Sequence, residues 1–183
     1  WSSDVCSADL AREDPGLIKT IARRGHEVGF HSYGHQHLTN TSAAELRAEL
    51  HDNKAYLEDL IGCSVSGYRA PAFSLTRASV WAIDVIQDAG FEYSSSILPA
   101  GSPIFGFPGA PRQPFRWPNG LLEIPVPVAR IGPLELPFLG GFYLRYLPAW
   151  FIRRCLGQGR PDQCYWIYCH PHDFDYEEAF YRI

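Results

Sequence analysis

The stretch GHEVGFHSYGHQH (residues 25–37) joins a helix end, a short strand and four of the seven histidines of this 183-residue chain. Gly25 ends a helical pattern, and HEVGF after it has the character of a short β-strand. His31 and His35 follow where this strand gives way to a loop. A single helical turn there would bring both imidazoles to one side, where they could share a cation. The alternative is a pair of ordinary surface or capping histidines.

Two imidazoles seldom complete a metal site, because a catalytic zinc usually has three protein ligands and an open position for water. Asp52, Glu123 and Asp173 could supply a carboxylate by residue type alone, and the pattern selects none of them. We interpret His26, at a helix end, and His37, on the loop, as structural.

The segments around this stretch alternate between helical and strand patterns. Capping residues and apolar spacing predict helices over residues 14–25, 42–62, 76–90 and 147–159. Apolar runs predict strands over residues 26–30, 65–73, 91–97, 121–131 and 164–175, with a Pro- and Gly-rich loop over 99–120. This alternation predicts an α/β fold with a parallel sheet or barrel.

Polar side chains follow several of the predicted strands at the point where each strand ends. They are His31 with His35, Arg69, and His170. Because the carboxyl ends of parallel strands meet at one mouth of an α/β barrel, we expect these side chains to converge there.

The composition excludes several classes of protein. Hydrophobic residues make up 46% of the chain and charged residues 20%, which favours one well-packed domain over disorder. A net charge of −4 without a basic run argues against nucleic acid as a partner. No apolar run approaches the roughly 20 residues that span a bilayer. Five cysteines without a close pair favour a reducing, cytoplasmic location.

The first ten residues, WSSDVCSADL, have no hydrophobic period and resemble the translation of a sequencing adapter. We therefore predict that residues 1–10 are an artefactual leader and leave them out of the fold prediction.

Six segments give the chain a family resemblance, in the order GHEVGFHSYGHQHL, YRAPAF, AGFEYSSSILP, LLEIPV, GGFYLRYLP and YCHPHDFD. Together they resemble the NodB-type polysaccharide deacetylases of carbohydrate esterase family 4, especially the group associated with exopolysaccharide gene clusters. The resemblance implies a distorted (β/α) barrel. It also implies metal-dependent hydrolysis of N-acetyl groups on a bacterial polysaccharide, with Zn²⁺ as the expected metal.

The resemblance also assigns roles to residues. His31 and His35 match the two metal-binding histidines. Arg69 matches the arginine that holds the catalytic aspartate, and His170 matches the general acid. An arginine or histidine at a strand end can also have a purely structural role.

Three further residues are predicted to contact substrate. Pro71 and Phe73 would shape the wall of the groove, since proline enforces an extended approach and phenylalanine offers an apolar face to a sugar. Tyr143 could serve as a sugar platform or belong to the core.

The chain departs from the family pattern at its start, where the motif T-F-D-D-G, with the catalytic base and the third metal ligand, is absent. Ser94 stands where the group usually has aspartate, and His172 and Asp173 stand where it usually has an aromatic residue and glutamate. We therefore predict that residues 11–183 form a partial deacetylase domain, incomplete at the N-terminus and impaired in activity. The alternatives are an allantoinase-like amidohydrolase and a non-catalytic carbohydrate-binding domain.

Overall fold

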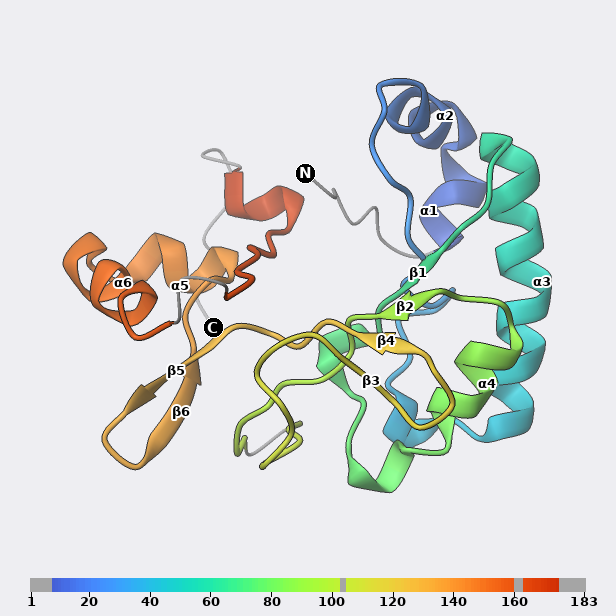
Figure 1. Ribbon diagram of the computed structural model, residues 1–183. Coiled ribbons are helices and arrows are strands. Elements are labelled where there is room, and N and C mark those ends of the chain that lie inside the picture. Colours follow the sequence, from blue (N-terminus) through green and yellow to red (C-terminus); the bar gives the residue numbers. More distant parts are fainter. Residues whose placement is uncertain (1–7, 103–104, 160–162, 175–183) are drawn as a thin grey trace, which may run out of the picture. The chain divides into compact units, whose positions relative to one another are not determined.

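The computed structural model describes residues 8–102, 105–159 and 163–174. The chain forms two compact units, Trp1–Val126 and Pro127–Ile183 (Figure 1). Helix α1 (Ala8–Glu13) begins within the predicted leader, whose first seven residues lie outside the described part. The prediction of one partial domain over residues 11–183 stays a prediction.

Two helices of the first unit begin at the capping residues that the sequence predicts. In α2 (Pro15–Arg23), the Asp14 side chain accepts a hydrogen bond from the Leu17 amide at 3.0 Å. A complete capping box of Ser42 and Glu45 starts α3 (Ala43–Ile61), which ends at Gly62 in the left-handed conformation. The predicted helix over residues 76–90 is instead a 3₁₀ turn, Arg77–Ser79, followed by α4 (Ala82–Asp88).

A four-stranded sheet forms the centre of this unit, in the order β1 (Gly67–Tyr68), β2 (Tyr93–Ser94), β4 (Leu122–Glu123) and β3 (Phe115–Arg116). β1, β2 and β4 run parallel, as the sequence predicts. β3 is antiparallel to β4 and comes from the segment predicted as a loop. The predicted strand over residues 26–30 joins the sheet only through Phe30, which pairs in parallel with Tyr68.

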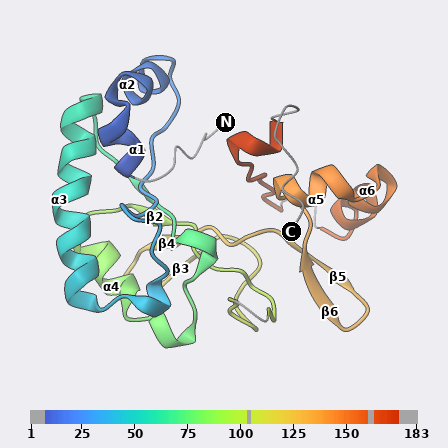
Figure 2. The same ribbon diagram turned by 180° about the vertical axis from the view of Figure 1, so that it is seen from behind.

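Helices α3 and α4 cover one side of this sheet (Figures 1 and 2). The aromatic rings of Phe30, Tyr68 and Phe91 form the centre of the core, with ring centroids 5.6–6.2 Å apart. Apolar residues of the helices complete it, among them Ile18, Leu46, Leu50, Leu57, Val85 and Ile86. Neighbouring residues in a strand point to opposite faces. Residues 29, 31, 67 and 69 therefore lie on the face of the sheet opposite α3 and α4.

On that other face, the ring of Tyr93 lies across Gly67. Its hydroxyl donates a hydrogen bond to the Glu27 carboxylate at 2.6 Å. A Cβ added at Gly67 would overlap the Tyr93 hydroxyl oxygen. A side chain at position 67 would therefore require the Tyr93 ring to move.

The second unit contains a β-hairpin and two helices. They are β5 (Val128–Ile131), β6 (Leu134–Pro137), α5 (Gly141–Tyr146) and α6 (Ala149–Leu156), with a 3₁₀ turn, Pro171–Phe174. Ala129, Phe138, Leu139 and Cys155 form a small separate core. Within the described residues, no helix combines the length and apolar character that crossing a membrane requires.

Two strand predictions are wrong here. The predicted strand over residues 121–131 is divided into β4 and β5, because Pro125 and Pro127 have no amide hydrogen to give to a sheet. In the described part of the predicted strand over residues 164–175, only Tyr168 pairs, with Gly140, before Pro171 begins the 3₁₀ turn. The prediction also missed β6 and α5.

We predict that Gly67→Ala destabilises the protein by about 1–3 kcal/mol, because the added methyl overpacks against the Tyr93 ring. The free energy of unfolding in urea measures this. In a Tyr93→Ala background the same substitution should cost much less. An equal cost in both backgrounds would show that the two side chains do not compete for this space.

Candidate functional site

The two candidate histidines lie on an irregular loop after Phe30, and the expected helical turn is not present. Ser32 and His35 instead adopt the left-handed conformation, with φ of 69° and 52°. Glu49 on α3 holds the loop by accepting hydrogen bonds from the Ser32 hydroxyl, at 2.8 Å, and from the Tyr33 amide. As a result, the rings of His31 and His35 lie with their centroids 5.1 Å apart.

The tautomer of His31 is fixed by Arg69, the residue that directly follows β1. The Nδ1 atom of His31 lies 2.9 Å from the carbonyl oxygen of Arg69. A carbonyl can only accept, so Nδ1 carries the proton, and in the neutral ring the lone pair is on Nε2. Metal-binding histidines are oriented in this way by a backbone carbonyl or carboxylate. The arrangement therefore suits His31 as a ligand through Nε2.

Arg69 lies beside this pair at the end of β1. Its Nε and Nη2 each lie 3.3 Å from an acceptor on Ser95, the carbonyl oxygen and the hydroxyl oxygen respectively. Its guanidinium carbon is 5.7 Å from the centre of the Phe73 ring. His31, Arg69, Tyr93 and Ser95 line one hollow above the sheet. The structure thus brings together three of the predicted site residues, His31, His35 and Arg69.

The two predicted groove residues differ in exposure. Pro71 is buried at the start of a 3₁₀ turn, Pro71–Phe73, whereas Phe73 is half-buried. Ala72 and Phe73 both have φ of 53°, which is unusual for residues with a side chain and re-aims the chain after Arg69. Substrate contact by Pro71 and Phe73 stays a prediction.

No carboxylate completes the histidine pair in the described part of the chain. Asp52 is exposed on α3 and contacts His51 at 3.0 Å, while Glu123 is fully buried and bonded elsewhere. Within residues 8–102, 105–159 and 163–174, no group of three histidine, cysteine or acidic side chains could hold a metal ion. The two imidazoles fit part of a zinc ligand set, which usually includes a third protein donor.

Glu123 is the centre of a buried polar network that the sequence analysis did not identify. One carboxyl oxygen accepts from the amides of Ser96, at 2.7 Å, and Ile97, at 3.2 Å. The other accepts from the Trp117 indole at 3.2 Å. Burial raises the pKa of the Glu123 carboxyl, although these hydrogen bonds oppose the shift. The run of serines after β2 and the glutamate on the neighbouring strand are the signal from which this network could have been inferred.

Ser94 occupies the position where the resemblance leads one to expect aspartate. Its hydroxyl donates to the Ser96 hydroxyl at 2.8 Å, and it pairs in register with Glu123. Both residues are fully buried. An aspartate at position 94 would place a second carboxyl beside Glu123 away from water, so serine fits this environment better.

The remaining predicted residues belong to the second unit. The His170 amide donates to the Asp173 carboxylate at 2.7 Å, and the His170 side chain is about half exposed, 51%. A Cβ on Gly141 would overlap this carboxylate, so a side chain at the start of α5 would displace that of Asp173. Tyr143 on α5 is half-buried, and burial raises the pKa of its hydroxyl. Convergence of His170 with the residues of the first unit stays a prediction.

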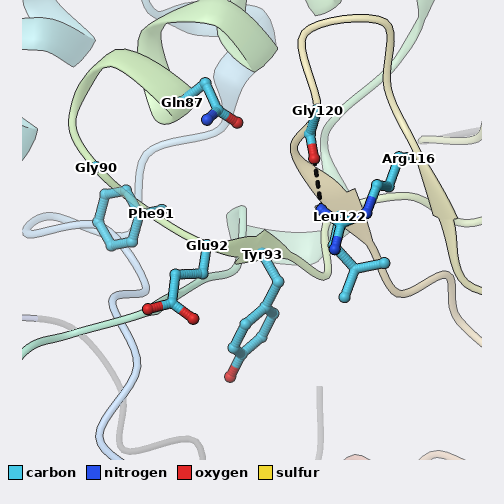
Figure 3. Close-up of a pocket in the computed structure, with 8 residues that line it drawn as sticks. All are labelled: Gln87, Gly90, Phe91, Glu92, Tyr93, Arg116, Gly120 and Leu122. Atoms are coloured by element: carbon cyan, nitrogen blue, oxygen red, sulfur yellow. Dashed lines mark hydrogen bonds between the residues drawn. The ribbon is translucent and has the colours of Figure 1, made fainter.

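A separate cavity of about 490 Å³ lies between the end of α4, the start of β2 and the β3–β4 hairpin (Figure 3). Arg116 closes one side by donating to the Gly120 carbonyl oxygen at 2.7 Å. The lining residues include Gln87, Glu92 and Tyr93, and none of the predicted site residues. This cavity lies where the strands begin, whereas His31 and Arg69 lie where the strands end.

Two family profiles divide the chain between them. Polysaccharide deacetylase matches residues 5–94, and a domain of unknown function, DUF3473, matches residues 95–182. The boundary between the profiles falls at the end of β2, and β4 from the second segment pairs directly with β2 from the first. The two matched segments therefore share one sheet.

A curated relative is the uncharacterized protein YlxY of Bacillus subtilis (strain 168), 26% identical over 88 residues, which are 42% of this chain and 28% of that protein. Among solved structures, a protein from Mycobacterium smegmatis described as a polysaccharide deacetylase is 25% identical. Its TM-score is 0.53, and the match covers 67% of this chain and 40% of that one. The chain thus spans less than half the length of these relatives.

A carbohydrate esterase family 4 pseudoenzyme from Bacillus anthracis is similar in fold, at 15% identity and a TM-score of 0.51, over 91% of this chain and 44% of that one. An allantoinase is also similar in fold, at 19% identity and a TM-score of 0.50, over 67% and 38%. The α/β fold agrees with the distorted barrel that the sequence predicts. Residues 5–94 of the chain thus match the polysaccharide deacetylase family, and the likeness to solved structures agrees with the resemblance to the NodB-type group of carbohydrate esterase family 4.

Proposed function

We propose that this chain is part of a hydrolase that removes acetyl groups from an N-acetylated bacterial polysaccharide. The observation that carries the proposal is the fixed tautomer of His31, which prepares Nε2 to bind a metal ion next to His35. The match of residues 5–94 to the polysaccharide deacetylase family supports the reaction class. An exopolysaccharide as the natural polymer and a cytoplasmic location are parts of this proposal.

An amide is a poor electrophile with a poor leaving group. A divalent metal, which we propose to be Zn²⁺, would acidify a water molecule and polarise the carbonyl. His31 and His35 would hold that metal. Arg69 would bind and orient a carboxylate at the end of β1, and His170 would give a proton to the departing amine. Phe73 and Tyr143 would contact the sugar.

The donor set also supports a second candidate, a non-catalytic carbohydrate-binding domain. Only two metal donors come together in the described residues, and the fold is shared with a pseudoenzyme. We propose accordingly that this chain by itself binds metal weakly and deacetylates slowly. The fold likeness to an allantoinase keeps small C–N substrates as a further alternative.

Zinc binding tests the ligand assignment. We expect His31→Ala and His35→Ala each to weaken zinc affinity at least about tenfold, measured by isothermal titration calorimetry. His51→Ala is the matched control, because His51 is exposed on α3 and pairs with Asp52 at 3.0 Å. Equal affinity in the wild type and both site variants would contradict the assignment.

Acetate release tests the reaction. Incubation with N-acetylated oligosaccharides should release acetate in an assay that a chelator abolishes and added zinc restores. Small cyclic amides should not be hydrolysed. Chelator-insensitive acetate release would contradict the metal mechanism, whereas oligosaccharide binding with no acetate release under any condition would favour the non-catalytic domain.

A further inference from the structure

We propose that Glu123 is a positioning residue, whose buried carboxyl fixes the turn after β2 and through it the orientation of His31. This inference rests on the proposed function in one respect, the role of His31 as a metal ligand. Three hydrogen bonds, each between described residues of the first unit, connect the two side chains.

The first step fixes the backbone after β2. Glu123 accepts from the amides of both Ser96 and Ile97 on a single oxygen, and its other oxygen accepts from Trp117. The carboxyl has no measurable exposure to solvent. A buried acceptor that satisfies two consecutive amides determines where the chain turns, because leaving those amides unpaired would be costly.

The second step passes from this turn to β1. The Ser96 hydroxyl oxygen accepts a hydrogen bond from the Ala70 amide at 2.9 Å, and both residues are buried. The Ala70 nitrogen belongs to the same planar peptide group as the Arg69 carbonyl. Fixing the direction of this N–H therefore also fixes the direction of the C=O.

The third step is the bond from His31 Nδ1 to that carbonyl, at 2.9 Å. The amide of Arg69 donates in turn to the Phe30 carbonyl at 2.8 Å, which anchors the other side of the residue. Ser95, within the same turn, holds the Arg69 guanidinium. One buried carboxyl thus positions both the imidazole and the guanidinium through the backbone and hydroxyls of the turn.

A pair of variants can separate the effect of the hydrogen bonds of Glu123 from the effect of its size and shape. In Glu123→Gln, the amide oxygen can still face Ser96 and Ile97, but its NH₂ group then faces the Trp117 N–H, donor against donor. Adding Trp117→Phe removes this conflict. We expect Glu123→Gln to shift the tautomer of His31, and the double variant Glu123→Gln with Trp117→Phe to restore the wild-type tautomer.

The tautomer of His31 is read from its ring ¹⁵N shifts in long-range ¹H–¹⁵N NMR spectra of the metal-free protein. We expect the Nδ1–H form in the wild type, and a mixture with the Nε2–H form in Glu123→Ala and Ser96→Ala. Zinc affinity should fall about tenfold in the same variants. Ile86→Ala, a core substitution on α4, should leave the tautomer unchanged despite lower stability.

An unchanged tautomer in a folded Glu123→Ala or Ser96→Ala variant would overturn the proposal. If Glu123→Ala does not fold, Ser96→Ala still decides, because it removes the link and keeps the carboxyl. A tautomer change in Ile86→Ala would also overturn it, since the effect would then follow general destabilisation. The NMR measurement needs neither bound metal nor enzymatic activity. The positioning role of Glu123 can therefore be tested even if the proposed function fails.

Discussion

The peptide group between Arg69 and Ala70 is the constraint on which the candidate site depends. It lies just past the end of β1, where its carbonyl accepts from His31 and its amide donates to Ser96. Parallel pairing of Phe30 with Tyr68, and of β1 with β2, brings the three segments to the same edge of the sheet. These short parallel pairings place the Arg69 carbonyl next to His31, and this carbonyl orients the imidazole.

Much of the first unit could be predicted because its signals are local. Asp14 and Ser42 with Glu45 mark helix starts, and Gly62 marks a helix end. Strand positions were less predictable, because each paired stretch in the main sheet has only two residues and periodicity needs more. Prolines then divided one predicted strand, and the hairpin of β5 with β6 carried no turn signal that the prediction used.

The sequence predicts which residues form the candidate site, but it does not predict which residues hold them in place. His31, His35 and Arg69 were identified from their place after strands, which is a property of the sequence. The residues that hold them, Glu49 and Glu123, come from elements distant along the chain. Long-range hydrogen bonds leave no periodic signal, and the left-handed φ of His35 cannot be inferred from the residue type alone, because most histidines have negative φ.

A crystal structure of the zinc-soaked protein, with anomalous diffraction measured at the zinc edge, tests whether His31 and His35 bind metal in the proposed orientation. We expect an anomalous peak within about 2.0–2.1 Å of His31 Nε2 and of a His35 ring nitrogen, with His31 Nδ1 still bonded to the Arg69 carbonyl. A peak bound elsewhere, or bound through His31 Nδ1 with that bond broken, would contradict this prediction.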